Sequence, residues 1–186
     1  MILQSVVALV TEGKEENLTT GKIAERAGVS VGSVYQYFPG KEAIFSSLIE
    51  WHLKKSLEDF RTALGSIGEK SLSEAVSQMV DSNFEVRRKN AVMDRALLKF
   101  FSRFGDLELL NKNDALLVQE VEKILDKAAG TGMIRKGNTT AFILVHAIRS
   151  TLLVTTLQRP EFYQNDELRN ELKRMIIGIL TPALGQ

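Results

Sequence analysis

Hydroxyl and amide side chains gather in a short stretch of the chain that carries no charge. Residues 27–40 contain no Asp, Glu, Lys or Arg, but they include Ser33, Tyr35, Gln36 and Tyr37. Phosphate oxygens and sugars receive at least half of the hydrogen bonds that proteins make to DNA, and glutamine can pair with adenine through two hydrogen bonds. The stretch therefore indicates contact with a nucleic acid. The alternative is a set of solvated polar side chains.

The elements around these residues are predicted to form a helix-turn-helix. Thr19 can cap a helix that ends near Gly28, where a left-handed residue is favoured, and Ser30 can cap a second helix over 31–37. The residues with helix-turn-helix spacing are Ile23, Ala24, Ala27, Gly28, Val29 and Val34. The spacing alone is also compatible with an ordinary helical hairpin inside a core, but the polar face beside Val34 favours the DNA-binding motif.

The rest of the chain also has a helical pattern, with apolar residues three and four positions apart. We find no convincing run of strand alternation. The predicted fold class is all-α, with nine helices that cover about residues 2–11, 20–27, 31–37, 41–64, 71–88, 91–103, 113–129, 138–158 and 165–180. The breaks fall at glycines and at the prolines 39, 160 and 182.

Composition excludes several classes of site. The 186 residues include no Cys and only two His, so disulfides and thiolate metal sites are excluded and a histidine-based metal site is disfavoured. The net charge of +1 favours no particular partner. We find no window of eighteen uncharged apolar residues, so the sequence predicts no membrane span and a cytoplasmic protein.

The stretch TTGKIAERAGVSVGSVYQYFPGKEAIF resembles the DNA-binding signature of the tetracycline-repressor (TetR) family of bacterial transcription regulators. The resemblance covers about residues 2–50. It implies an N-terminal DNA-binding domain over 1–46 and a ligand-binding and dimerisation domain over 47–186. It further implies a homodimer that binds a palindromic operator and releases it when a small molecule enters the C-terminal domain.

The resemblance assigns roles to single residues. Thr20, Tyr35 and Lys41 match positions that contact phosphates. The residues that match positions near bases or backbone are Val31, Gly32, Ser33, Gln36 and Tyr37. The position of Val31 is often basic in the family, so this helix is expected to contact fewer phosphates or to favour a thymine methyl group.

The charge of the N-terminal segment departs from this expectation. Residues 1–51 hold four Lys/Arg and six Glu, a net charge of −2, which is poor for a DNA-binding unit. The positive charge must then come from Lys41, Lys22 or Arg26, or from a basic arm that precedes the first helix in family members. Either the native chain begins earlier, or DNA affinity is weak with a shallow salt dependence.

Two features of the C-terminal segment are informative. Helices 138–158 and 165–180 have broad apolar faces, which can cover their own core and still pair with a second copy. The family resemblance implies a four-helix dimer interface here, and the alternative is that these faces form only an internal core. An effector pocket is expected from the resemblance, and its candidate residues are Phe100, Phe101, Phe104, His146 and Arg149. The alternative for each residue is a place in the core, an ion pair or the dimer interface.

The leading hypothesis is a ligand-responsive repressor that is not an enzyme and needs no cofactor besides its small-molecule effector. A helical-bundle enzyme of the di-iron type would need Glu-x-x-His pairs, but Ile49 precedes His52 and Ile143 precedes His146 at that spacing. A helical adaptor that binds proteins through Tyr35 and Tyr37 remains the third alternative.

Overall fold

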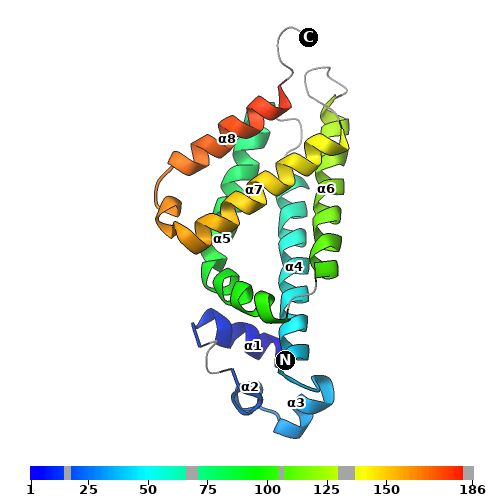
Figure 1. The fold of residues 1–186 in the computed structure, drawn as a ribbon, viewed down its shortest axis with the longest axis vertical. Helices are drawn as coiled ribbons and strands as arrows, with labels where there is room; N and C mark the ends of the chain where they lie inside the picture. Colours follow the sequence, from blue (N-terminus) through cyan, green and yellow to red (C-terminus); the bar gives the residue numbers. More distant parts are fainter. Residues whose placement is uncertain (15–17, 66–70, 105–106, 130–136, 182–186) are drawn as a thin grey trace. The chain divides into compact units, whose positions relative to one another are not determined.

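The structure is a computed structural model that describes residues 1–14, 18–65, 71–104, 107–129 and 137–181. In these ranges the chain forms eight α-helices and one 3-10 helix, with no strand (Figure 1). The helices are α1 (Ile2–Thr11), α2 (Thr20–Ala27), α3 (Val31–Tyr37), α4 (Lys41–Gly65), α5 (Leu72–Phe104), α6 (Leu107–Ala129), α7 (Asn138–Gln158) and α8 (Glu167–Leu180), and the 3-10 helix is η2 (Pro160–Tyr163). The predicted all-α class is confirmed.

The chain packs as two compact units. The first unit contains residues 1–55 and 89–110, and the second contains residues 56–88 and 111–186. Helices α4 and α5 each contribute one part to each unit. The helix-turn-helix thus shares its unit with the second half of α5, which lies far away in the sequence. The expected division into functional domains at residues 46 and 47 remains a prediction.

Local signals set the ends of the first three helices. The Thr19 side chain accepts a hydrogen bond from the backbone N–H of Lys22 and caps α2. Gly28 follows with φ of 66°, a left-handed conformation that lets the chain leave the helix. The Ser30 side chain caps α3 by accepting from the N–H of Ser33 at 3.0 Å. The predicted boundaries of this motif are confirmed.

Helix α5 corrects one prediction. We expected two helices, over 71–88 and 91–103, but the structure has one helix of 33 residues. The cause is that 72–104 contains neither Pro nor Gly, so the polar run near Lys89 and Asn90 does not interrupt the backbone hydrogen bonds. Ser71 and Glu74 form a capping box at its start. Helix α6 also begins earlier than expected, at Leu107 rather than near residue 113.

Each unit has its own apolar core. The first is built on α1 to α4 and the second half of α5, and its fully buried members include Val10, Val34 and Phe45. The second is built on α5 to α8 and includes Phe84 and Ile176. Burial of each such side chain contributes about 1.5–3 kcal/mol to the free energy of folding. The apolar core of each unit therefore stabilises the packing of its helices.

Helix α7 is long and apolar enough to cross a membrane by length and composition, which the sequence pattern did not predict. It is also a packed helix of the second unit, because Ala141, Leu144 and Leu152 are buried in the core. Buried core helices commonly meet the same criterion, and we interpret α7 as one of them.

Candidate nucleic-acid interface

The helix-turn-helix is held together from its inner face. Val34 has no exposed surface and packs in a core with Ala24, whose small side chain allows α2 and α3 to approach closely. Val29 and Phe38 pack against the same core from the two ends of α3. These contacts fix which side of α3 faces outward.

The outward side of α3 carries the polar residues that the sequence singled out. Tyr35 and Tyr37 are 51% and 73% exposed, and Gln36 is exposed as well. Val31 and Gly32 are exposed at the start of the helix. Exposed aromatic rings with polar ends are suited to contact with a partner, because each ring supplies both apolar area and a hydrogen-bonding hydroxyl. The structure therefore places these predicted contact residues on a free surface.

Ser33 has a different setting, because it is half-buried and engaged locally. Its hydroxyl lies 2.9 Å from the hydroxyl of Ser30, and its N–H donates to the same Ser30 oxygen. Part of its hydrogen-bonding capacity thus maintains the start of α3.

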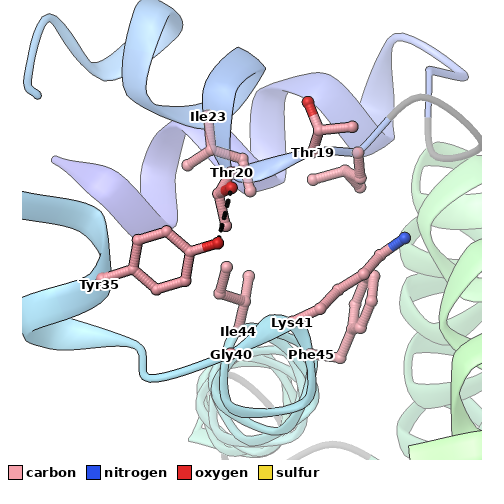
Figure 2. A pocket seen from close by; sticks show the side chains of 9 residues that line it. Thr19, Thr20, Ile23, Tyr35, Gly40, Lys41, Ile44 and Phe45 are labelled. Atoms are coloured by element: carbon pink, nitrogen blue, oxygen red, sulfur yellow. Dashed lines mark hydrogen bonds between the residues drawn. The ribbon is translucent and has the colours of Figure 1, made fainter. Parts of the chain in front are cut away.

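Thr20, Tyr35 and Lys41 surround one hollow of about 290 Å³. Figure 2 shows the hydroxyls of Thr20 and Tyr35 facing each other, and their oxygens are 3.4 Å apart. The hollow lies between the first turns of α2 and α4, and Gly40 and apolar residues such as Ile44 form the rest of its wall. The fold thus brings Thr20 together with Tyr35 and Lys41, which lie 15 or more positions further along the sequence.

The Lys41 side chain takes a separate direction. In Figure 2 its ammonium extends away from the two hydroxyls, and it lies 5.5 Å from the centre of the Phe45 ring. Lys41 is exposed and begins α4, where free backbone N–H groups favour an anion. The surface consequently offers two points for phosphate, a hydroxyl pair and an ammonium at a helix N-terminus.

Glu12 neutralises part of the positive charge of this unit. Its carboxylate forms an ion pair with the Arg26 guanidinium and lies 2.7 Å from the Lys14 ammonium. Hydrogen bonds from Lys14 and Arg26 hold the pKa of Glu12 below its ordinary value. Arg26 is therefore engaged and is a poor source of the charge that the sequence analysis sought. This pairing was not foreseen, because no pattern links residues 12 and 26.

Comparison with known proteins identifies the family. Residues 7–48 match the model of bacterial regulatory proteins of the tetR family, and residues 71–180 match the model of the tetracyclin repressor-like C-terminal domain. The second match alone covers more than half of the chain. The chain belongs to the TetR family. The predicted resemblance is thereby confirmed, and it extends beyond residues 2–50.

Individual relatives agree with this assignment. The chain is 31% identical over 109 residues to the nucleoid occlusion factor SlmA of Haemophilus ducreyi. The matched segment covers 58% of this chain and 53% of that protein. It is 24% identical over 157 residues to SlmA of Shewanella pealeana, covering 84% of this chain and 77% of that protein. The chain thus spans about half the length of the first of these curated relatives.

Solved structures show the same fold. Salmonella enterica GusR has a TM-score of 0.70 at 19% identity and covers 96% of this chain and 93% of its own. FadR from Bacillus subtilis in complex with stearoyl-CoA has a TM-score of 0.63 at 22% identity, with coverage of 99% and 98%. At these identities the similarity concerns the fold alone.

The five effector-pocket candidates of this TetR-family chain fall into different settings. Phe100 belongs to the first unit, where its ring stacks on Phe45 at 3.9 Å between centroids. His146 and Arg149 belong to the second unit and meet at Asp114 of α6. The side chains of Phe101 and Phe104 lie outside the described residues. The structure thus brings two of the five together and adds Asp114, which the sequence pattern did not indicate.

A further pair joins α4 to α5 inside the first unit. His52 Nε2 lies 2.9 Å from Asp94 Oδ1, and the Asp94 side chain is almost fully buried. Together with the Phe45–Phe100 stack, it ties the second half of α5 to the helix that begins at Lys41.

Proposed function

We propose that this chain is a ligand-responsive repressor that binds a palindromic operator and releases it when a small molecule binds the C-terminal part. The observation that carries the proposal is the convergence of Thr20, Tyr35 and Lys41 around one surface hollow beside the exposed face of α3. Membership of the TetR family supports it, because regulators of this family bind DNA and small-molecule ligands as dimers.

The hydroxyls of Thr20 and Tyr35 would bind one phosphate together. Their 3.4 Å separation is longer than a strong hydroxyl hydrogen bond, so each hydroxyl can turn to donate to a phosphate oxygen at little cost. Lys41 would contact a neighbouring phosphate with its ammonium. These contacts set the position of the protein on DNA but do not read its sequence.

Base recognition would fall to the outward side of α3. In helix-turn-helix proteins the second helix enters the major groove, and its N-terminal residues reach base edges. Gly32 allows close approach there, Val31 offers an apolar contact for a thymine methyl, and Gln36 can pair with adenine. Ser33 and Tyr37 would complete the contact with bases or backbone.

Dimerisation would use α7 and α8. Helix α7 exposes large apolar side chains that its own unit leaves uncovered: Phe142, Ile143, Val154 and Leu157. A twofold interface over this face would bury them. Binding of both half-sites of an operator would require the two copies of α3 to lie about 34 Å apart, one turn of DNA.

The effector would bind in the second unit near His146 and Arg149, and it would favour a different spacing of the two recognition helices. A role in effector binding for the phenylalanines at 100, 101 and 104, which belong to the first unit, remains a separate prediction. In this proposal the protein acts in the cytoplasm, carries no catalytic site and needs no cofactor.

The test is selection of bound fragments from genomic DNA, followed by fluorescence anisotropy with wild type and Tyr35→Phe. We expect a palindromic footprint, salt-sensitive binding, and a loss of about two- to tenfold for Tyr35→Phe, since one neutral hydrogen bond is removed. Tyr163→Phe is the matched control. Its hydroxyl donates to the carbonyl of Leu152 in the second unit, so its loss affects stability and leaves operator affinity unchanged.

Two results would overturn the proposal. Absence of sequence-preferring DNA binding would favour the helical adaptor, with Tyr35 and Tyr37 at a protein interface. Equal affinity of wild type and Tyr35→Phe for a selected operator would remove Tyr35 from the contact surface.

A further inference from the structure

A charged cluster lies half-buried in the second unit. The Arg149 guanidinium of α7 contacts the Asp114 carboxylate of α6, and their side chains are 23% and 20% exposed. His146, one turn before Arg149, has its Nδ1 3.9 Å from the other Asp114 oxygen. The Asp114 carboxylate therefore lies close to two basic side chains, at a site that is partly accessible to solvent.

A second guanidinium stands near this pair. Burial lowers the pKa of Arg149, and the positive charge of Arg87 on α5 lowers it further. Arg87 also has contacts of its own. Arg87 and Arg149 thus contribute positive charge from two helices of the same unit, where partial burial weakens the screening by water.

We propose that this cluster is the subsite for an anionic group of the effector, a carboxylate or a phosphate ester that Arg149 binds and that the positive charge of Arg87 also favours. This inference rests on the proposed function and names the chemical class of its ligand. The planar guanidinium is suited to both groups, because its N–H donors can bind two oxygens of one anion at once.

The position of Asp114 gives such a ligand a way to act. A ligand anion competes with Asp114 for Arg149, and Asp114 is the residue through which Arg149 links α7 to α6. Binding would therefore replace a contact between two helices by a contact to the ligand.

The test compares probes that differ only in their charged group, by thermal shift and calorimetry on the full chain. Octanoate, octyl phosphate and octan-1-ol share one apolar body, and inorganic phosphate supplies the anion alone. We expect one of the two octyl anions to bind more tightly than the alcohol. Tighter binding of octanoate would indicate a carboxylate site, and tighter binding of octyl phosphate would indicate a phosphate-ester site.

The variants are Arg149→Gln and Arg87→Gln, with Arg61→Gln as control. Arg61 lies in the same unit and pairs with Glu120 at a more exposed site. We expect the first two to lose about ten- to hundredfold in anion affinity, the range of a hydrogen bond between charged groups, and the control to lose none. Arg149→Lys keeps the positive charge but loses the planar set of N–H donors. It should therefore bind the anion more tightly than Arg149→Gln does but more weakly than wild type.

Three results would overturn the inference: equal affinity for octan-1-ol and both octyl anions, anion affinity equal to that of wild type in both Arg87→Gln and Arg149→Lys, or no response to any anion. If Arg149→Gln fails to fold, the anion affinities of Arg87→Gln and Arg149→Lys test the inference. Operator binding is measured separately on the same samples. Intact operator binding without anion preference rejects only this inference, whereas absent operator binding rejects the proposed function.

Discussion

The two units place their polar groups in opposite ways. In the first unit, exposed polar side chains surround α3: Tyr35, Gln36, Tyr37 and Lys41. Glu12 and Arg26 form an ion pair that is also exposed to solvent. In the second unit, Asp114 and Arg149 are half-buried between two helices. The first arrangement suits a long polymer that approaches from outside, whereas the second suits a small molecule that is largely enclosed.

This difference explains how a DNA-binding unit can do without a strongly basic motif. In the proposed function, hydroxyls and a helix N-terminus would contact phosphate without the desolvation cost of many charges. The affinity then depends on the geometry of a few groups. That geometry is held by the apolar core beneath them, above all by Phe45, which lines the hollow and stacks on Phe100.

The largest effects are expected in the two cores. Phe45→Ala in the first unit and Phe84→Ala in the second each remove a buried ring, so each should lower the free energy of unfolding by about 3–5 kcal/mol. Urea unfolding followed by circular dichroism measures this loss. The two variants should differ in DNA binding: at a temperature where both remain folded, Phe45→Ala loses operator affinity and Phe84→Ala keeps it.

Equal loss of operator affinity in both variants would contradict the separation of the two units. A loss of stability below about 1 kcal/mol for either ring would contradict its place in a tightly packed core.

A smaller effect is expected at the exposed face of α7. Leu157→Glu places a charge in the proposed dimer interface, so the dissociation constant of the dimer should rise by about tenfold or more. Sedimentation velocity measures the change. Leu116→Glu on α6 is the matched control, since Leu116 is also an exposed leucine of the second unit. A monomeric wild type, or equal effects of the two variants, would exclude α7 as the interface.

The smallest effect concerns Glu12. Because the folded-state pKa of Glu12 is lowered, its ion pairs stabilise the protein at neutral pH and lose that effect as the pH falls below the ordinary value of 4.5 and through the lower folded-state value. Thermal midpoints of wild type and Glu12→Gln should therefore differ slightly at pH 7 and converge in acid. A difference that persists unchanged in acid would show that the pairing contributes nothing through ionisation.

Helix ends were predictable because they depend on neighbouring residues. Thr19, Gly28 and Ser30 define the helix-turn-helix through local hydrogen bonds and one left-handed glycine, and the bounds 138–158 of α7 agree with prediction. The polar run near Lys89 and Asn90 predicted a break, but α5 is continuous because polar side chains leave the backbone hydrogen bonds of a helix intact, unlike Pro.

Contacts between distant residues could not be predicted from the pattern. Asp114 is one of five acidic residues on the amphipathic helix α6, and nothing in the neighbouring sequence indicates that Arg149 will contact it. The same holds for Glu12 with Arg26 and for Phe45 with Phe100. These pairs depend on how helices pack, which one sequence does not specify residue by residue.

The salt dependence of operator binding by Lys41→Gln tests the central claim most directly, because it counts phosphate contacts. If Lys41 binds a phosphate, its neutralisation reduces the slope of log affinity against log salt by about one and weakens binding to all DNA sequences alike. Arg26→Gln, at a cation already paired with Glu12, should leave the slope unchanged. An unchanged slope for Lys41→Gln, or an equal change for Arg26→Gln, would contradict the account.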